Sequence, residues 1–145
     1  MHPLVISGSC FCGDIRFEIQ GELPPLYQCH CSECRKTTGS NANAGLLILR
    51  KNFTWLAGEE QIKTYLKASG FRINFCPTCS SPVPNIVTKL PTLMWIPVGL
   101  IDSDLPSTVQ HHLYVNSKAN WDVITGTAQQ HAELPADLQV LLPQE

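Results

Sequence analysis

The chain has 145 residues, a length that fits one domain with its own hydrophobic core. A net charge of −2 excludes the strong positive potential of a general nucleic-acid binder or an anionic-membrane binder. No apolar run approaches the roughly 18 residues of a membrane span, and the first residues lack the basic start and apolar length of a secretory signal. We therefore expect one domain over residues 1–145, a cytoplasmic location, and no nucleic-acid or membrane partner.

The predicted elements are mostly short strands. In residues 13–20, Ile15, Phe17 and Ile19 alternate with polar residues, which is typical of a strand with one buried face. Further strands are predicted at 26–31, 44–49, 53–56, 61–66, 71–75, 83–87, 93–98 and 113–115. One helical turn is expected at 32–38 and a short helix at 136–142. Eleven prolines and nine glycines favour many turns, so the predicted fold class is mainly β.

The seven cysteines are many for a chain of this length, and they fall into three groups. An odd number of cysteines without a secretory signal argues against a disulfide framework. Clustered cysteines in a reducing compartment are instead typical of metal ligands. The groups are Cys10-Phe11-Cys12, Cys29-His30-Cys31-Ser32-Glu33-Cys34 and Cys76-Pro77-Thr78-Cys79.

The first and third groups each supply a pair of thiolates. Cys76 and Cys79 have the spacing of a zinc knuckle, whereas Cys10 and Cys12, two residues apart on an extended segment, point to one face. Tetrahedral structural zinc needs four ligands, so the two pairs together predict one closed, four-cysteine zinc site. Structural zinc binding contributes on the order of 10 kcal/mol in small peptides, so this site is expected to stabilise the fold.

The middle group brings Cys29, Cys31 and Cys34 within six residues. Two closed sites would need eight ligands, and seven cysteines leave one position for another side chain, water or substrate. Three protein ligands with an exchangeable fourth are typical of catalytic zinc. The alternative is a second structural site closed by a histidine other than His30, which on an extended segment points away from Cys29 and Cys31. The candidates for that role are His111, His112 and His131.

Longer motifs surround the three cysteine groups, and a fourth motif follows them. They are Gly8-Ser9-Cys10-Phe11-Cys12-Gly13-Asp14-Ile15-Arg16-Phe17, Cys29-His30-Cys31-Ser32-Glu33-Cys34-Arg35-Lys36-Thr37-Thr38-Gly39, Phe75-Cys76-Pro77-Thr78-Cys79-Ser80-Ser81-Pro82 and Ser117-Lys118-Ala119-Asn120-Trp121-Asp122. In this order, over roughly residues 7–124, they resemble the glutathione-dependent formaldehyde-activating enzyme family, also called the Gfa or CENP-V family. Any one motif is weak, whereas the ordered set is specific. Within the last motif, Trp121 is expected to be a packing anchor.

The resemblance implies a fold, two metal sites and an activity. The fold is the β-tent, an all-β architecture of small antiparallel sheets. The implied activity joins formaldehyde to glutathione as S-hydroxymethylglutathione, formally a carbon–sulfur lyase acting in reverse. The resemblance assigns structural zinc to Cys10, Cys12, Cys76 and Cys79, and catalytic zinc to Cys29, Cys31 and Cys34.

The substrate contacts are less marked in the sequence than the metal ligands. Three thiolates on zinc form a soft centre, for which the thiolate of glutathione or another small thiol is a natural fourth ligand. Arg35 and Lys36 beside Cys34 are candidates to meet a substrate carboxylate, and solvated surface charge is the alternative for both. Glutathione carries two carboxylates and an amine, and Arg72 is one of few further groups that the sequence offers to them.

A second hypothesis comes from a different class of protein. The chain would then be a non-catalytic, zinc-stabilised binding or interaction module. Such a module should expose an apolar patch and fully ligate its second zinc. An enzyme should instead show a cleft over Cys29, Cys31 and Cys34 with an open coordination position.

Overall fold

Strands account for most of the regular structure in the computed structural model, which describes residues 4–144. The one α-helix within that range is α1 (Ser32–Thr38), at the bounds predicted for a helical turn. The mainly β class predicted from the sequence is confirmed. The strands are β1 (Val5–Ser9), β2 (Arg16–Gln20), β3 (Leu26–Cys29), β4 (Asn43–Leu49), β5 (Phe53–Ala57), β6 (Lys63–Leu66), β7 (Arg72–Phe75), β8 (Asn85–Ile86), β9 (Leu93–Pro97), β10 (Val109–Leu113) and β11 (Gln129–Gln130).

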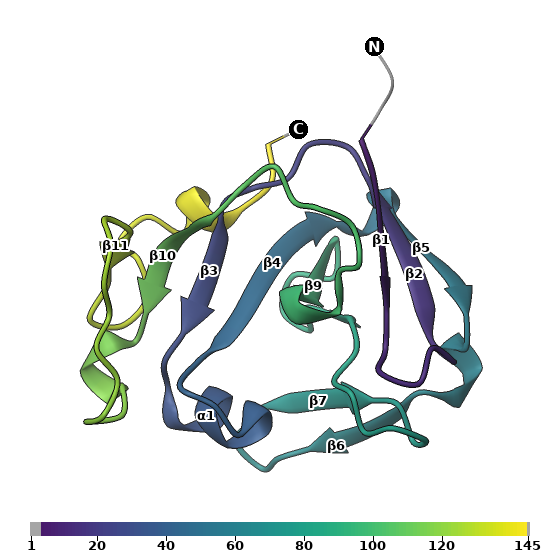
Figure 1. Ribbon diagram of the computed structural model, residues 1–145, viewed down its shortest axis with the longest axis horizontal. Coiled ribbons are helices and arrows are strands. Elements are labelled where there is room, and N and C mark those ends of the chain that lie inside the picture. The colour runs from purple at the N-terminus through teal and green to yellow at the C-terminus, as the bar shows by residue number, and fades with distance from the viewer. Residues whose placement is uncertain (1–3, 145) are drawn as a thin grey trace.

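Two of the three sheets formed by residues 4–144 are antiparallel throughout. The order β1-β2-β5 forms a three-stranded sheet, and β6 with β7 forms a two-stranded hairpin. Figure 1 shows this hairpin running across one end of the molecule, beside α1. Contacts between side chains join them: the Glu33 carboxylate of α1 accepts a hydrogen bond from Ser69 and lies 3.2 Å from the Lys67 ammonium.

The largest sheet has six strands in the order β11-β10-β3-β4-β9-β8. Its central pairs are antiparallel, as expected for the fold class, but β10 runs parallel to both β3 and β11. The strand predicted at 113–115 begins too late in the chain, because β10 ends at Leu113 and Tyr114 takes a left-handed backbone conformation with φ 57°. The sequence does not reveal β10 because this strand buries two consecutive histidines, which do not produce an apolar alternation.

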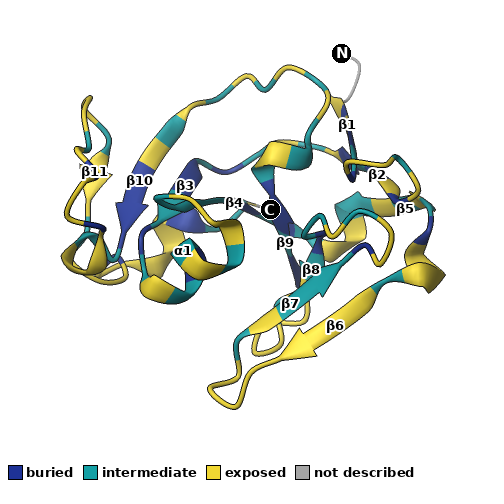
Figure 2. Cartoon of the chain, turned by 60° about the horizontal axis from the view of Figure 1, so that its bottom comes forward, coloured by how far each residue is buried: buried dark blue, intermediate teal, exposed yellow. Residues whose placement is uncertain are grey.

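The main hydrophobic core lies between the three-stranded and six-stranded sheets. The predicted inward face of residues 13–20 is confirmed, since Ile15, Phe17 and Ile19 are all buried. Figure 2 shows the contrast between β9, which is largely buried, and β6, which is exposed along its length. Each fully buried Ile, Leu or Phe contributes roughly 2 kcal/mol to folding. The core residues are Ile6, Phe17, Ile19, Leu26, Leu46, Ile48, Met94 and Ile96.

The C-terminal segment forms less helix than predicted. A single 3-10 turn over Leu138–Leu141 replaces the expected helix at 136–142, and the Asp137 carboxylate caps it by accepting from the Gln139 amide. Leu141 is the only buried residue of this turn. None of the helices between residues 4 and 144 has the length and apolar character needed to cross a membrane.

Candidate metal centres and cavity

Two turns far apart in sequence bring the first and third cysteine groups together. Cys10 and Cys12 lie in the turn between β1 and β2, where Gly13 donates to the Cys10 carbonyl and Cys10 donates to the Ile15 carbonyl. Cys76 begins the turn after β7, which closes when Ser80 donates to the Cys76 carbonyl. The sulfurs of Cys10, Cys12, Cys76 and Cys79 all lie within 4.8 Å of one another.

The spacing of these sulfurs fits a tetrahedral metal ion. The Cys10 and Cys12 sulfurs are 3.6 Å apart, and those of Cys12 and Cys76 are 3.7 Å apart. A zinc ion with Zn–S bonds of about 2.3 Å places tetrahedral sulfurs about 3.8 Å apart, whereas a disulfide would need about 2.05 Å. The four thiols, which form no disulfide, can therefore hold one metal ion. Its position between the β1–β2 turn and the chain after β7 would join two sheets.

The middle group forms a second cluster at the junction of β3 and α1. Cys29 is the last residue of β3, and Cys31 caps α1 by accepting a hydrogen bond from the Cys34 amide at 3.3 Å. Gly39 ends the helix in the left-handed conformation, with φ 63°. The three sulfurs lie within 4.8 Å of one another, so this cluster can also hold a metal ion.

The electrostatics of this second cluster favour a bound cation. A hydrogen bond from the Cys34 thiol lowers the pKa of Cys29 to about 6, and the same contact raises the pKa of Cys34. Burial, together with the charge on Cys29, also raises the pKa of Cys31. One thiolate is thus stabilised by its neighbours, whereas three adjacent thiolates need a positive ion to offset their repulsion.

The histidines predicted as alternative fourth ligands are engaged elsewhere, and within residues 4–144 none joins the three-cysteine cluster. His30 is fully buried, with its Nδ1 3.2 Å from an Asp122 oxygen and its Nε2 2.9 Å from Nδ1 of His112. His111 pairs with His131 in the same way, at 3.0 Å. The three-cysteine cluster is therefore not closed by any of these side chains.

Asp122 and His112 hold the His30 ring at its two nitrogens. Nδ1 of His30 donates to the Asp122 carboxylate, and Nε2 of His30 is hydrogen-bonded to Nδ1 of His112. Burial, reinforced by His30, lowers the pKa of His112 and keeps its ring neutral. Lys118 donates to the Asp122 carbonyl at 2.8 Å, which anchors the segment that carries the carboxylate. Because His30 lies between Cys29 and Cys31, this network helps to hold the backbone of the three-cysteine cluster in place.

Asp122→Ala should lower the free energy of unfolding by about 3 kcal/mol, because it leaves the buried Nδ1–H of His30 without an acceptor. Urea denaturation of the metal-loaded protein measures this change. Asp137→Ala is the matched control: it removes a carboxylate that accepts one exposed amide hydrogen bond and should cost about 1 kcal/mol. Equal effects of the two substitutions would contradict the structural role of Asp122.

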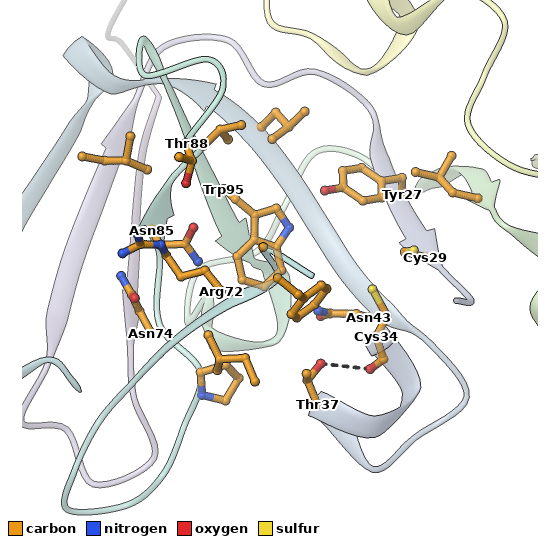
Figure 3. Close-up of a pocket in the computed structure, with 18 of the residues that line it drawn as sticks. Tyr27, Cys29, Cys34, Thr37, Asn43, Arg72, Asn74, Asn85, Thr88 and Trp95 are labelled. Carbon is orange, nitrogen blue, oxygen red and sulfur yellow. Dashed lines mark hydrogen bonds between the residues drawn. The ribbon is translucent and has the colours of Figure 1, made fainter. Parts of the chain in front are cut away.

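A cavity of about 470 Å³ opens beside the second cluster, and Cys29 and Cys34 line it. Figure 3 shows both cysteines at one side of the cavity and Trp95 in its middle. The wall comes from elements across the chain, including β3, α1, β4, β7, β8 and β9. Gly45 of β4 allows the aromatic wall, since a Cβ there would lie 2.6 Å from the Trp95 indole nitrogen and 2.7 Å from the Tyr27 ring.

The charged residues predicted beside the cluster lie outside the lining of this cavity. Arg35 and Lys36 are on α1, Lys36 is exposed, and Arg72 and Lys89 are the cations that line the wall. The substrate contact predicted for Arg35 and Lys36 stays a prediction. Trp121 is 67% exposed, so the expected packing anchor is wrong, and the buried residues of that motif are Ala119 and Asp122.

Sequence reasoning missed Asn74 and Asn85 of the cavity wall and the buried histidine network. Asn74 and Asn85 lie in strands, where asparagine is rare. Asparagines within predicted strands were therefore the feature of the sequence that could have indicated a polar wall. Nothing local could pair His30 with His112 and Asp122, which lie 82 and 92 residues away along the chain.

The fold and its two clusters define a small β protein with two sites that can hold metal ions. The model of the family described as glutathione-dependent formaldehyde-activating enzyme matches residues 5–117, and the chain belongs to this family. A Halomonas elongata protein that provisionally carries the same description is 32% identical over 134 residues, which span 87% of this chain and 85% of that protein.

A solved structure shows the same fold. The crystal structure of a Rhodobacter sphaeroides protein superposes with a TM-score of 0.55 at 21% identity. The match covers 69% of this chain and 91% of that one. The resemblance to this family in the cysteine motifs is therefore confirmed by an independent match over most of the chain.

Proposed function

We propose that this protein is a zinc-dependent enzyme of the carbon–sulfur lyase type. Its substrate would be the adduct of formaldehyde with glutathione or another small thiol, such as S-hydroxymethylglutathione. The description of its family and of the Halomonas elongata relative supports this assignment. The observation that carries it is the three-cysteine cluster, which lacks a fourth protein ligand within residues 4–144 and opens on a cavity.

The two clusters would have different roles. Cys10, Cys12, Cys76 and Cys79 would hold a structural zinc, and Cys29, Cys31 and Cys34 would hold a catalytic one. When bound at an open site, zinc stabilises the thiolate form of a thiol ligand at neutral pH. The cavity on Cys29 and Cys34 favours this enzyme over the non-catalytic module, which would need a closed second cluster.

The residues of the chain position the reactants and hold a proton. The cavity walls place the sulfur of a thiol beside Cys29 and Cys34 and limit the access of water, which favours reaction with a nearby aldehyde. Tyr27 lines the cavity, and burial raises the pKa of its phenol, so Oη keeps its proton at neutral pH. That O–H group can donate a hydrogen bond to the aldehyde oxygen as negative charge develops on it.

The direct test is adduct formation followed by NMR. Formaldehyde is mixed with glutathione, and separately with other small thiols, in the presence of protein loaded with two zinc ions. We expect at least one hydroxymethyl thiol adduct to form faster than without protein, and the same adduct to decompose faster when it is supplied. If every thiol reacts at its uncatalysed rate with both metals bound, the proposed activity is absent.

A further inference from the structure

The cavity beside Cys29 and Cys34 has two chemically different ends. Figure 3 shows the two cysteines on one side and Arg72, Asn74 and Asn85 on the other. A ligand with its sulfur at the cysteines would therefore reach the guanidinium and the two amides with its far end. The proposed function explains only the end that carries the cysteines.

The space between the two ends is mostly apolar, although Thr37, Thr38 and Asn43 also line the wall. Trp95 lies in its middle, and no charged side chain lines this part of the wall among the residues that the structure describes. Such a wall favours a hydrocarbon body and disfavours amide groups, which lose hydrogen bonds to water when they are buried without partners. The apolar lining residues include Tyr27, Leu47, Phe71, Ile73, Trp95 and Leu113.

The far end carries positive charge without a counter-charge. Arg72 and Lys89 line the cavity, and no aspartate or glutamate is among the described residues of its wall. Arg72 is also free of ion pairs: those found between residues 4 and 144 join His30 with Asp122 and Lys67 with Glu33. A guanidinium on a strand, flanked by amides, can hold a carboxylate with two parallel hydrogen bonds.

Glutathione matches this lining poorly. It carries two peptide bonds along its body, two carboxylates and one ammonium group, and the wall, over the residues described, offers no carboxylate to the ammonium. Its body would bury amide groups against Trp95 and Phe71. A thiol with a hydrocarbon body and one terminal carboxylate satisfies both ends of the cavity and its middle.

We infer that this site selects thiols, or their formaldehyde adducts, with an apolar body and a single terminal carboxylate, and that Arg72 determines this selectivity. The inference rests on the proposed function, because it places the ligand sulfur at the metal held by Cys29, Cys31 and Cys34. It goes beyond that function in naming the class of thiol and the residue that recognises it.

Isothermal titration calorimetry on the zinc-loaded protein tests the inference with three probes: ω-mercaptohexanoate, ω-mercaptohexanol and glutathione. We expect the mercaptohexanoate to bind about tenfold more tightly than the mercaptohexanol, since the exposed guanidinium of Arg72 can hold its carboxylate with two parallel, charge-assisted hydrogen bonds. It should also bind about tenfold more tightly than glutathione. Quenching of Trp95 fluorescence, absent in Trp95→Phe, would report that the bound thiol occupies this cavity.

Arg72→Gln should remove the preference for the carboxylate and leave the affinity for mercaptohexanol unchanged. Lys63→Gln is the matched control, because Lys63 is an exposed cation on the same hairpin that does not line the cavity. Lys89→Gln should change the selectivity less than Arg72→Gln does, since a lysine cannot form the bidentate contact.

The outcomes separate the two proposals. If glutathione binds as tightly as the mercaptohexanoate, or if Arg72→Gln keeps the carboxylate preference, the inference is wrong and the proposed function stands. If none of the three thiols binds to protein that holds two zinc ions, both fail. Circular dichroism of each variant confirms that the fold is retained.

Discussion

Replacing Cys76 by serine should abolish cooperative folding of the protein at room temperature. Cys76 is fully buried, and its sulfur belongs to the cluster that joins the β1–β2 turn to the chain after β7. Loss of a structural zinc removes on the order of 10 kcal/mol, which is comparable to the roughly 5–15 kcal/mol that stabilises a whole domain. Thermal unfolding followed by circular dichroism, with a metal count on the same sample, measures the effect.

Cys34→Ser is the matched control for this prediction, because it makes the same change at another buried cysteine. Its cluster ties together residues within one short segment, whereas Cys12 and Cys76 lie 64 residues apart. Closing the longer loop removes more entropy from the unfolded chain, so the four-cysteine cluster should contribute more to stability. A cooperative transition of Cys76→Ser at the wild-type temperature would contradict the structural role of the four-cysteine cluster.

Cys31→Ser should reduce the proposed activity by at least about 100-fold while the fold is kept. Changes to residues that merely support a metal ligand cost about 10–100-fold in metal affinity or activity, and loss of a ligand should cost more. The rate of formation of the thiol–formaldehyde adduct measures the loss. The metal count should fall from two zinc ions to one.

Ser32→Ala is the control for that variant, because Ser32 is the neighbour of Cys31 in α1 and contributes no sulfur. It should retain the wild-type rate and both metals. If Cys31→Ser catalyses the reaction at the wild-type rate, the three-cysteine cluster is not the catalytic centre. A normal rate together with the loss of one zinc would exclude a catalytic role for the cluster in the same way.

The features predicted from the sequence are those that depend on neighbouring residues. The alternation around Phe17 predicted the buried face of β2, and the helical turn expected at 32–38 matches α1. The cysteine spacing predicted the division into a group of four and a group of three, because each pair or triple already converges within its own turn. These patterns need no knowledge of how the sheets pair.

The features that the sequence did not reveal depend on long-range contacts. The parallel pairing of β10 with β3 places His112 beside Gln28, where it reaches His30, and no periodicity in either segment predicts that contact. The same packing buries Asp122 and leaves Trp121 exposed, the reverse of what residue size suggests. The cavity wall could not be predicted for the same reason, since Arg72 and the cysteines come to line one cavity only through the arrangement of separate sheets.

X-ray absorption spectroscopy at the zinc edge, combined with a metal count, tests the central claim most directly. We predict two zinc ions per chain with an average of about 3.5 sulfurs each, one site with four sulfurs and one with three sulfurs and a light atom. Addition of a small thiol should raise the average toward four. A single zinc bound by four sulfurs in freshly prepared, zinc-saturated protein, or a second zinc closed by a fourth protein side chain, would contradict the claim that the three-cysteine cluster holds an open metal site.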